Sequence, residues 1–270
     1  MIVTAPSMVQ AANGLSLDHP IILWNSVVNS FDLASTTEDE LYPVSNLANP
    51  ASHLIWRGSG DASPAAIEYI TLDTDAQLPI DSVGIAKHNF GSNGNAISIE
   101  ADDGGGFDVL IAPFTPDDDS PLLIRFNPVY VQSIRVKIAV GAEEPEAAVL
   151  YIGSALILPR KIYQGHTPIN FGRRRKTVVG KSESGNYLGS IITTEWRETR
   201  QSLTLIEPAY YREHIDPFIE ACGDTPFFFG WRPESYPGDL GYAWMTNEPM
   251  PRNATGHGLI EIELQMSGIV

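Results

Sequence analysis

The sequence contains a single cysteine and no long apolar run. Because Cys222 has no second cysteine to pair with, an internal disulfide and a cysteine-based zinc cluster are excluded. No apolar stretch reaches the roughly 20 residues that a membrane-spanning helix needs, so we expect no membrane insertion. Residues 1–12 hold no basic residue and no apolar core of signal length, so we also expect no cleaved secretion signal.

Positive charge is scarce in the first half of the chain. Residues 1–150 carry 5 Lys and Arg against 20 Asp and Glu, whereas residues 151–270 carry 12 against 13. Such an asymmetry often separates domains, and it predicts one domain over residues 1–160 and a second over residues 161–270. The acidic first half repels nucleic-acid phosphates, so we expect no nucleic-acid partner.

Catalytic and metal-binding motifs are also missing. The sequence has no G-x-S-x-G, no H-E-x-x-H and no phosphate-binding glycine loop, and its six histidines are isolated. We therefore expect no enzymatic activity, no catalytic residue, no cofactor and no metal site, although two carboxylates that meet only in space would escape this search. The run Asp117–Asp119 indicates a solvated acidic loop in preference to a calcium site, and residues 102–106 indicate a glycine hairpin turn.

Helical signal is scarce and strand signal is abundant. Apolar and polar residues alternate over residues 97–101, 133–140 and 260–266, which is the period of a half-buried strand. The 43 Gly and Pro residues are spread along the chain, which favours a mainly β fold of sandwiches or barrels. One helix is expected over residues 208–222, where Pro208 suits the first position and Pro217 predicts a kink.

The segment from Tyr163 to Tyr187 is rich in glycine and poor in large apolar residues. It also holds the densest basic cluster of the chain, Arg173, Arg174, Arg175 and Lys176. This composition predicts an extended loop or a long hairpin that reaches away from the core. Two roles stay open for it, a contact with a neighbouring subunit and a surface loop without a partner.

The order of short motifs between Tyr42 and Pro159 resembles the discoidin family, the coagulation-factor type C modules. The matching stretches are an opening loop, a W-R step and the core strands, at residues 43–50, 55–58, 66–73, 81–85, 96–104, 131–136 and 148–158. The resemblance implies a galactose-binding-like jelly roll, a β-sandwich, over residues 1–160. The disulfide that often closes this module has no counterpart here, because the chain has one cysteine.

The same resemblance implies candidate ligand residues for a surface glycan. Trp56 and Arg57 offer an aromatic platform with a forked donor, and the loop after a strand offers His88, Asn89 and Phe90. Alternatives remain for both groups, because such a tryptophan commonly packs in the core and the loop is equally well explained as structural.

The second half resembles the β-barrel-plus-helix domain that tail tube and distal-tail hub proteins of long-tailed bacteriophages share. The stretches that carry this resemblance are residues 225–231, Ala243–Trp244 and the alternating final strand 259–267. The aromatic run indicates a strand buried on both faces. A carbohydrate platform made of Trp231, Tyr236 and Trp244 is the alternative.

This second resemblance implies a structural protein of the distal tail or baseplate of a virion, assembled in the bacterial cytoplasm. Its partners would be copies of itself in a ring and other tail proteins, with the jelly roll outside and able to contact host glycans. Because a net charge of −16 makes identical copies repel, the cluster Arg173–Lys176 is expected to contact an acidic surface of the adjacent subunit or of a tail partner. The alternative is a stand-alone carbohydrate-binding, lectin-like protein, which would not form a closed ring.

Overall fold

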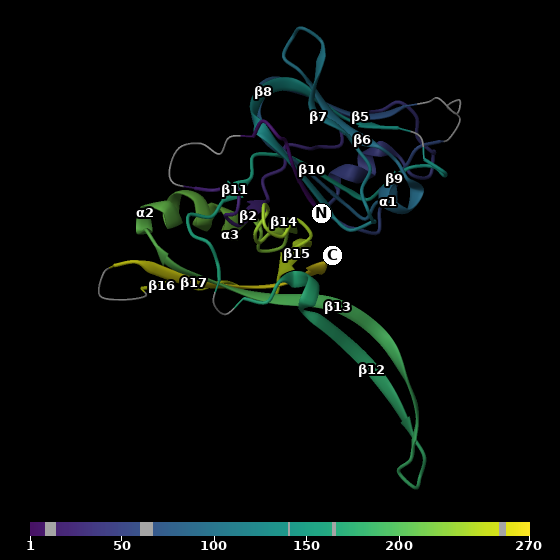
Figure 1. The fold of residues 1–270 in the computed structure, drawn as a ribbon, viewed down its shortest axis with the longest axis vertical. Coiled ribbons are helices and arrows are strands. Elements are labelled where there is room, and N and C mark those ends of the chain that lie inside the picture. Colours follow the sequence, from purple (N-terminus) through teal and green to yellow (C-terminus); the bar gives the residue numbers. More distant parts are fainter. Residues whose placement is uncertain (9–14, 60–66, 140, 164–165, 254–257) are drawn as a thin grey trace.

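The computed structural model describes residues 1–8, 15–59, 67–139, 141–163, 166–253 and 258–270. These residues form two packed β assemblies and one long projecting hairpin (Figure 1). In the described part of the chain, no helix has the length and apolar character that crossing a bilayer would take.

Two long bent strands build the first assembly. Strands β5 (Glu68–Ala86) and β8 (Leu122–Ile138) pair antiparallel, and register shifts between Asp73 and Ser82 divide the pairing into two parts. In one part, β3 (Leu33–Ser35) pairs with β5, β6 (Ile97–Asp102) pairs with β8, and β7 (Phe107–Phe114) pairs with β6. In the other part, β10 (Val149–Gly153) pairs with β5 and β1 (Ile2–Thr4) pairs with β8. The two parts fold over each other as the layers of a sandwich.

β-Branched side chains fill the space between these layers. Ile70 and Val136 come from one layer and Val83 and Ile124 from the other, and each is at most 2% exposed. Short elements close the ends of the sandwich: η1 (Val44–Ala48), β4 (Trp56–Arg57), α1 (Phe90–Asn93) and β9 (Glu146–Ala147). The predicted jelly-roll β-sandwich is confirmed.

The second assembly is a curled eight-stranded sheet. Its strands follow the order β11 (Leu156–Ile157), β2 (Ile21–Leu23), β14 (Phe227–Gly230), β15 (Leu240–Met245), β17 (Ile260–Ile269), β13 (Tyr187–Ile206) and β12 (Arg173–Lys181), with β16 (Arg252–Asn253) beside β17. One helical segment covers its core, as predicted. It consists of α2 (Pro208–Tyr210), the π-helical turn η3 (Tyr211–Ile215) and α3 (Asp216–Ala221). The π-helical turn directly precedes the turn that holds Pro217, where the sequence predicted a kink.

The two assemblies are interleaved and share a buried interface. Strand β2 comes from the N-terminal part of the chain but lies between β11 and β14, so sheet membership does not change at residue 160. Phe228 points to the jelly roll, where it packs on Tyr151 and Tyr242, whereas Phe227 and Phe229 point into the core beneath the helix. The predicted burial of the aromatic strand on both faces is therefore confirmed.

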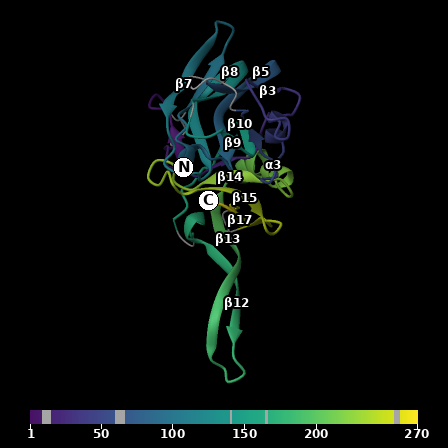
Figure 2. The ribbon, with the colours of Figure 1, turned by 90° about the vertical axis from the view of Figure 1, so that its right-hand side faces the viewer.

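The projecting hairpin, which we call the arm (residues 173–198), consists of β12 and the first half of β13. At about 3.3 Å per residue, the nine residues of β12 span roughly 30 Å. Both views show the arm running alone away from the rest of the molecule (Figures 1 and 2). The long-hairpin alternative of the sequence prediction is thus the one found. A 3₁₀ turn, η2 (Ile169–Phe171), leads into its base.

Candidate functional site

A cluster of polar groups around one arginine, which lies over an aromatic ring, is found at the end of the jelly roll. Arg57 on β4 places its guanidinium 4.4 Å from the centre of the Tyr42 ring. The same guanidinium binds Glu146 on β9, with 2.7 Å between Nε and Oε1, and Glu144 lies 4.0 Å away. We call Tyr42, Arg57, Asn89, Glu144 and Glu146 the corner cluster.

Asn89 joins this cluster through the backbone of the strand that carries Glu146. Its Oδ1 accepts from the Glu146 amide at 2.9 Å, and its Nδ2 donates to the Glu144 carbonyl at 2.8 Å. The fold thereby brings two predicted ligand residues, Arg57 and Asn89, to one place. Tyr42 was not predicted, because its contact with Arg57 arises only when the opening loop folds back over β4.

The other three predicted ligand residues are buried. Trp56 and Phe90 are 0% exposed and His88 is 5% exposed. Burial lowers the pKa of His88 to about 4, and both ring nitrogens are engaged as in the neutral form. Nε2 donates to the Ser120 carbonyl at 2.8 Å, and Nδ1 accepts from the Phe90 amide at 3.2 Å. A ligand at this end of the jelly roll would therefore meet Arg57 and Asn89, while the three buried side chains hold the loop in place.

The carboxylates of the acidic turns accept hydrogen bonds from backbone amides. Asp102 Oδ1 accepts from the Gly104 and Gly106 amides, and both glycines have φ near +110°. The predicted hairpin turn between β6 and β7 is confirmed. Asp118 accepts from the Ser120 amide and Asp119 from the Ser92 amide. Among the described residues, no group of three or more His, Cys, Asp or Glu is placed to hold a metal ion.

The three residues of the alternative aromatic platform do not form one exposed surface. The Trp231 ring stacks on Tyr236 at 5.5 Å between centres, and His166 lies 4.3 Å from the same ring. Trp244 is 39% exposed, and within the described residues no ring contact joins it to the other two.

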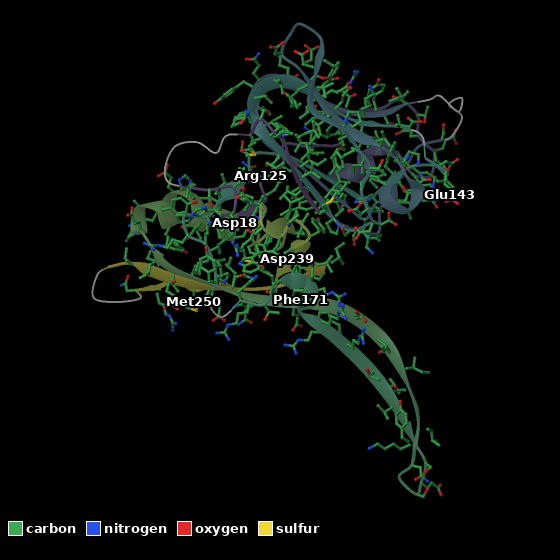
Figure 3. All side chains as sticks on the ribbon, viewed as in Figure 1. Asp18, Arg125, Glu143, Phe171, Asp239 and Met250 are labelled. Carbon is green, nitrogen blue, oxygen red and sulfur yellow. The ribbon has the colours of Figure 1, made fainter. Side chains whose placement is uncertain are left out.

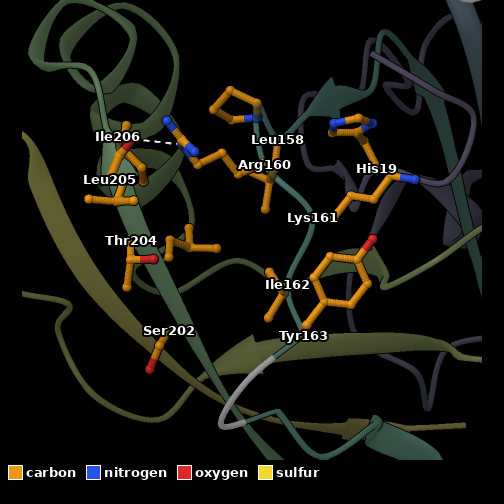
Figure 4. A pocket seen from close by; sticks show the side chains of 12 residues that line it. His19, Leu158, Arg160, Lys161, Ile162, Tyr163, Ser202, Thr204, Leu205 and Ile206 are labelled. Atoms are coloured by element: carbon orange, nitrogen blue, oxygen red, sulfur yellow. Dashed lines mark hydrogen bonds between the residues drawn. The ribbon is translucent and has the colours of Figure 1, made fainter. Parts of the chain in front are cut away.

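A cleft of about 430 Å³ lies between residues 158–163 and the end of β13 (Figure 4). Its lysine and its arginine bind groups of the same chain. Arg160 donates to the Leu205 carbonyl at 2.9 Å, and Lys161 lies 3.6 Å from Asp18. The positive charges of this cleft therefore already have partners.

The arm carries the predicted basic cluster, and two of its arginines are paired within the hairpin. Arg174 binds Glu198 at 2.9 Å and Arg175 binds Glu195 at 2.7 Å across the two strands. No carboxylate of the described residues lies within 4.0 Å of Arg173, Lys176 or Lys181. These three cationic side chains of the arm are therefore available to bind another molecule.

The arm also exposes large apolar side chains on both of its faces. Val178 and Ile191 face each other across the strands and are 57% and 71% exposed, while Leu188 and Tyr187 near the tip are 68% and 67% exposed. Val179 and Ile192, next along each strand, point to the opposite face because side chains alternate. A two-stranded ribbon without a core is marginally stable in water, and a soluble chain rarely exposes such a patch without a partner.

Comparisons with known proteins give neither a matching family model nor a matching curated protein. Among solved structures, the chain is similar to chitosan-binding module 1 of a chitosanase/glucanase from Paenibacillus sp. IK-5, at 12% identity over 48% of this chain and 99% of the other, with a TM-score of 0.41. It is also similar to the family 32 carbohydrate-binding module of Clostridium perfringens NanJ in complex with galactose, at 15% identity over 51% and 99%, with a TM-score of 0.41. A pectin-binding module matches at 16% identity over 48% and 91%, with a TM-score of 0.37. Likenesses this distant do not indicate what the present chain binds.

Proposed function

We propose that the protein is the structural subunit of a homo-oligomeric assembly and that the arm makes the contacts between subunits. The observation that carries the proposal is the arm itself, a ribbon with apolar side chains exposed on both faces. A neighbouring subunit that covers the arm would remove these side chains from water, which stabilises the assembly by about 25 cal/mol per Å² of apolar surface buried.

The assembly that we propose is the distal tail or baseplate of a long-tailed bacteriophage, with the protein built into the virion in the bacterial cytoplasm. A β domain with one helix is what the resemblance of about residues 172–270 to tail tube and hub domains implies, and the proposal of a tail assembly rests on that resemblance. The jelly roll lies on the side of the sheet away from the arm (Figure 2), where it would face outward. The proposed role needs no catalytic residue and no cofactor.

The test compares two variants that remove apolar side chains of similar exposure. V178S/I191S acts on the arm, and the control V109S acts on the jelly roll, where Val109 is 58% exposed against 57% for Val178. By sedimentation velocity, we expect the parent and V109S to form a closed oligomer and V178S/I191S to remain a folded monomer. A parent that stays monomeric at all concentrations, or an arm variant that assembles like the parent, would refute the proposal.

A second function, binding of a glycan by the jelly roll, is favoured by the corner cluster. Its guanidinium lies over the Tyr42 ring and beside the carboxylates of Glu144 and Glu146, and sugar hydroxyls need donors and acceptors of this kind beside an aromatic surface. This site could serve within the assembly or in a stand-alone lectin, and the oligomeric state separates the two.

A glycan array with the parent and two arginine variants tests this second function. R57A removes the centre of the corner cluster. R135A removes an arginine with the same kind of partners elsewhere on the jelly roll, a tyrosine ring at 4.1 Å and the carboxylate of Glu100. We expect R57A to abolish binding and R135A to retain it. No binding by the parent, or equal binding by both variants, would contradict the assignment.

A further inference from the structure

A second cleft lies at the end of the helical segment, between α3 and the loop after β15. It measures about 950 Å³, and we call it the helix-end cleft. Ile219, Met245 and Met250 supply apolar surface, and Met250 is 82% exposed. The volume is large enough for several side chains of another molecule.

The charges that line the helix-end cleft all have one sign. Asp216 and Glu220 come from α3 and Glu248 from the opposite loop, while no lysine or arginine lines the cleft in the described part of the chain. Asp216 accepts from the Tyr211 hydroxyl at 3.2 Å. Glu220 and Glu248 are exposed and form no ion pair with another described residue. A ligand of this cleft should therefore combine positive charge with apolar side chains.

The arm has this combination, and it stands out from the rest of the chain. Residues 173–198 carry six basic and three acidic residues, so the arm holds +3 while the whole chain holds −16, which leaves −19 elsewhere. Lys176 and Lys181, which form no ion pair with a described residue, flank the exposed pair Val178 and Val179 on β12.

The arm of a molecule points away from that molecule's own helix-end cleft. Met250 lies at the edge of the sheet on the side of the helix, whereas the arm leaves the sheet beyond Phe171 and runs in the other direction (Figure 3). The two surfaces are different patches of the chain, so a contact between them is heterologous. Heterologous contacts between identical copies generate rings when the rotation closes and filaments when it does not.

We infer that the part of the arm beyond Arg175, which we call the outer arm, docks in the helix-end cleft of the next copy, with Lys176 and Lys181 facing Glu220 and Glu248. This inference rests on the proposed assembly through the arm and names the surface that receives it. Val178, Val179 and Tyr187 pack against Met245, Met250 and Ile219 in this arrangement. Opposite charges at the contact offset the repulsion between acidic subunits and select one orientation.

Charge reversal on each side of the contact tests the inference. E220K/E248K makes the cleft basic and K176E/K181E makes the outer arm acidic. Each variant alone should require at least about a tenfold higher concentration for half-maximal assembly, because like charges then face each other at every contact. An equimolar mixture should assemble again as an alternating oligomer, since each reversed arm then meets a reversed cleft and each normal arm meets a normal cleft, so that opposite charges face each other at every contact.

The matched control is E213K/E234K, which reverses two exposed carboxylates that do not line the helix-end cleft. It should assemble like the parent, and raised salt should weaken assembly of the parent and the control alike. If the parent assembles, V178S/I191S does not, and E220K/E248K behaves like the control, the arm docks elsewhere and only this inference fails. If the parent does not assemble at all, the proposed function fails with it. Absence of co-assembly in the mixture would also overturn the inference.

Discussion

Substitution of Gly84 by alanine should test whether the jelly roll and the second sheet form one rigid unit. Gly84 lies on β5 at the interface between them, and a Cβ atom there would stand 2.6 Å from the Phe228 ring. Phe228 is fully buried against Tyr151 and Tyr242, so its ring cannot move without disturbing two further aromatic side chains. The added methyl group therefore overpacks the interface.

Overpacking of this kind costs about 1–3 kcal/mol of the free energy of unfolding. Alanine also restricts the backbone of the unfolded chain, which stabilises the folded state by only about 0.4–1 kcal/mol. G84A should therefore lower the free energy of unfolding by roughly 1–2 kcal/mol. F228A opens a cavity instead and should cost about 3–5 kcal/mol. In the double variant the methyl group added at position 84 enters this cavity, so the two effects should couple by about 1–2 kcal/mol.

Urea unfolding followed by circular dichroism measures these differences, with V178S/I191S as the background so that assembly does not add to stability. The control is G238A, because a Cβ at Gly238 meets no atom within 4 Å. Equal midpoints for G84A and G238A, or strict additivity of G84A and F228A, would refute the interface as described. Two separate transitions in the parent would show that the halves unfold independently and would favour the predicted division near residue 160.

Two further predictions concern buried titratable groups. The pKa of His88 is about 4 in the folded chain against an ordinary 6.5, so the unfolded state binds the proton first as pH falls. Through this residue, the free energy of unfolding should fall by about 2–3 kcal/mol between pH 6.5 and pH 4.5. Urea midpoints measured at the two pH values should fall less for H88Q than for the parent, and an equal fall would contradict the burial of a neutral His88. Cys222 is 1% exposed and burial raises the pKa of its thiol to about 12. At pH 8 the thiol should react with Ellman's reagent only after denaturation, and fast labelling of the folded protein would contradict the structure.

The strand pattern and the one helix were predictable because they depend on local periodicity. Alternation over residues 133–140 and 260–266 corresponds to β8 and β17, and the helical segment begins at Pro208 as expected. The long hairpin followed from glycine, basic residues and a small number of large apolar side chains between Tyr163 and Tyr187. Only the structure shows that its valines and isoleucines are exposed on both faces, because that depends on where the two-stranded ribbon stands relative to the two cores (Figure 1).

The candidate ligand residues show the limit of local reasoning. The discoidin resemblance implies ligand residues in two short runs, Trp56–Arg57 and His88–Phe90, yet successive residues of a strand or tight loop point in opposite directions. Arg57 and Asn89 therefore reach the corner cluster, while Trp56, His88 and Phe90 turn into the core. Their partners Tyr42 and Glu146 come from distant segments.

The sequence alone determined the mainly β class, the helical segment that begins at Pro208, the acidic charge and the absence of disulfides, because each depends on composition or on short-range pattern. Only the tertiary structure decided that Leu23 pairs with Phe228, that Gly84 makes room for the same ring, and that the arm stands free. These features depend on pairings between residues far apart in the chain, which no local pattern encodes. The physical reason is that burial and packing depend on which surfaces come into contact. In this protein the contacting surfaces of the two sheets form only when strands from distant parts of the chain have paired.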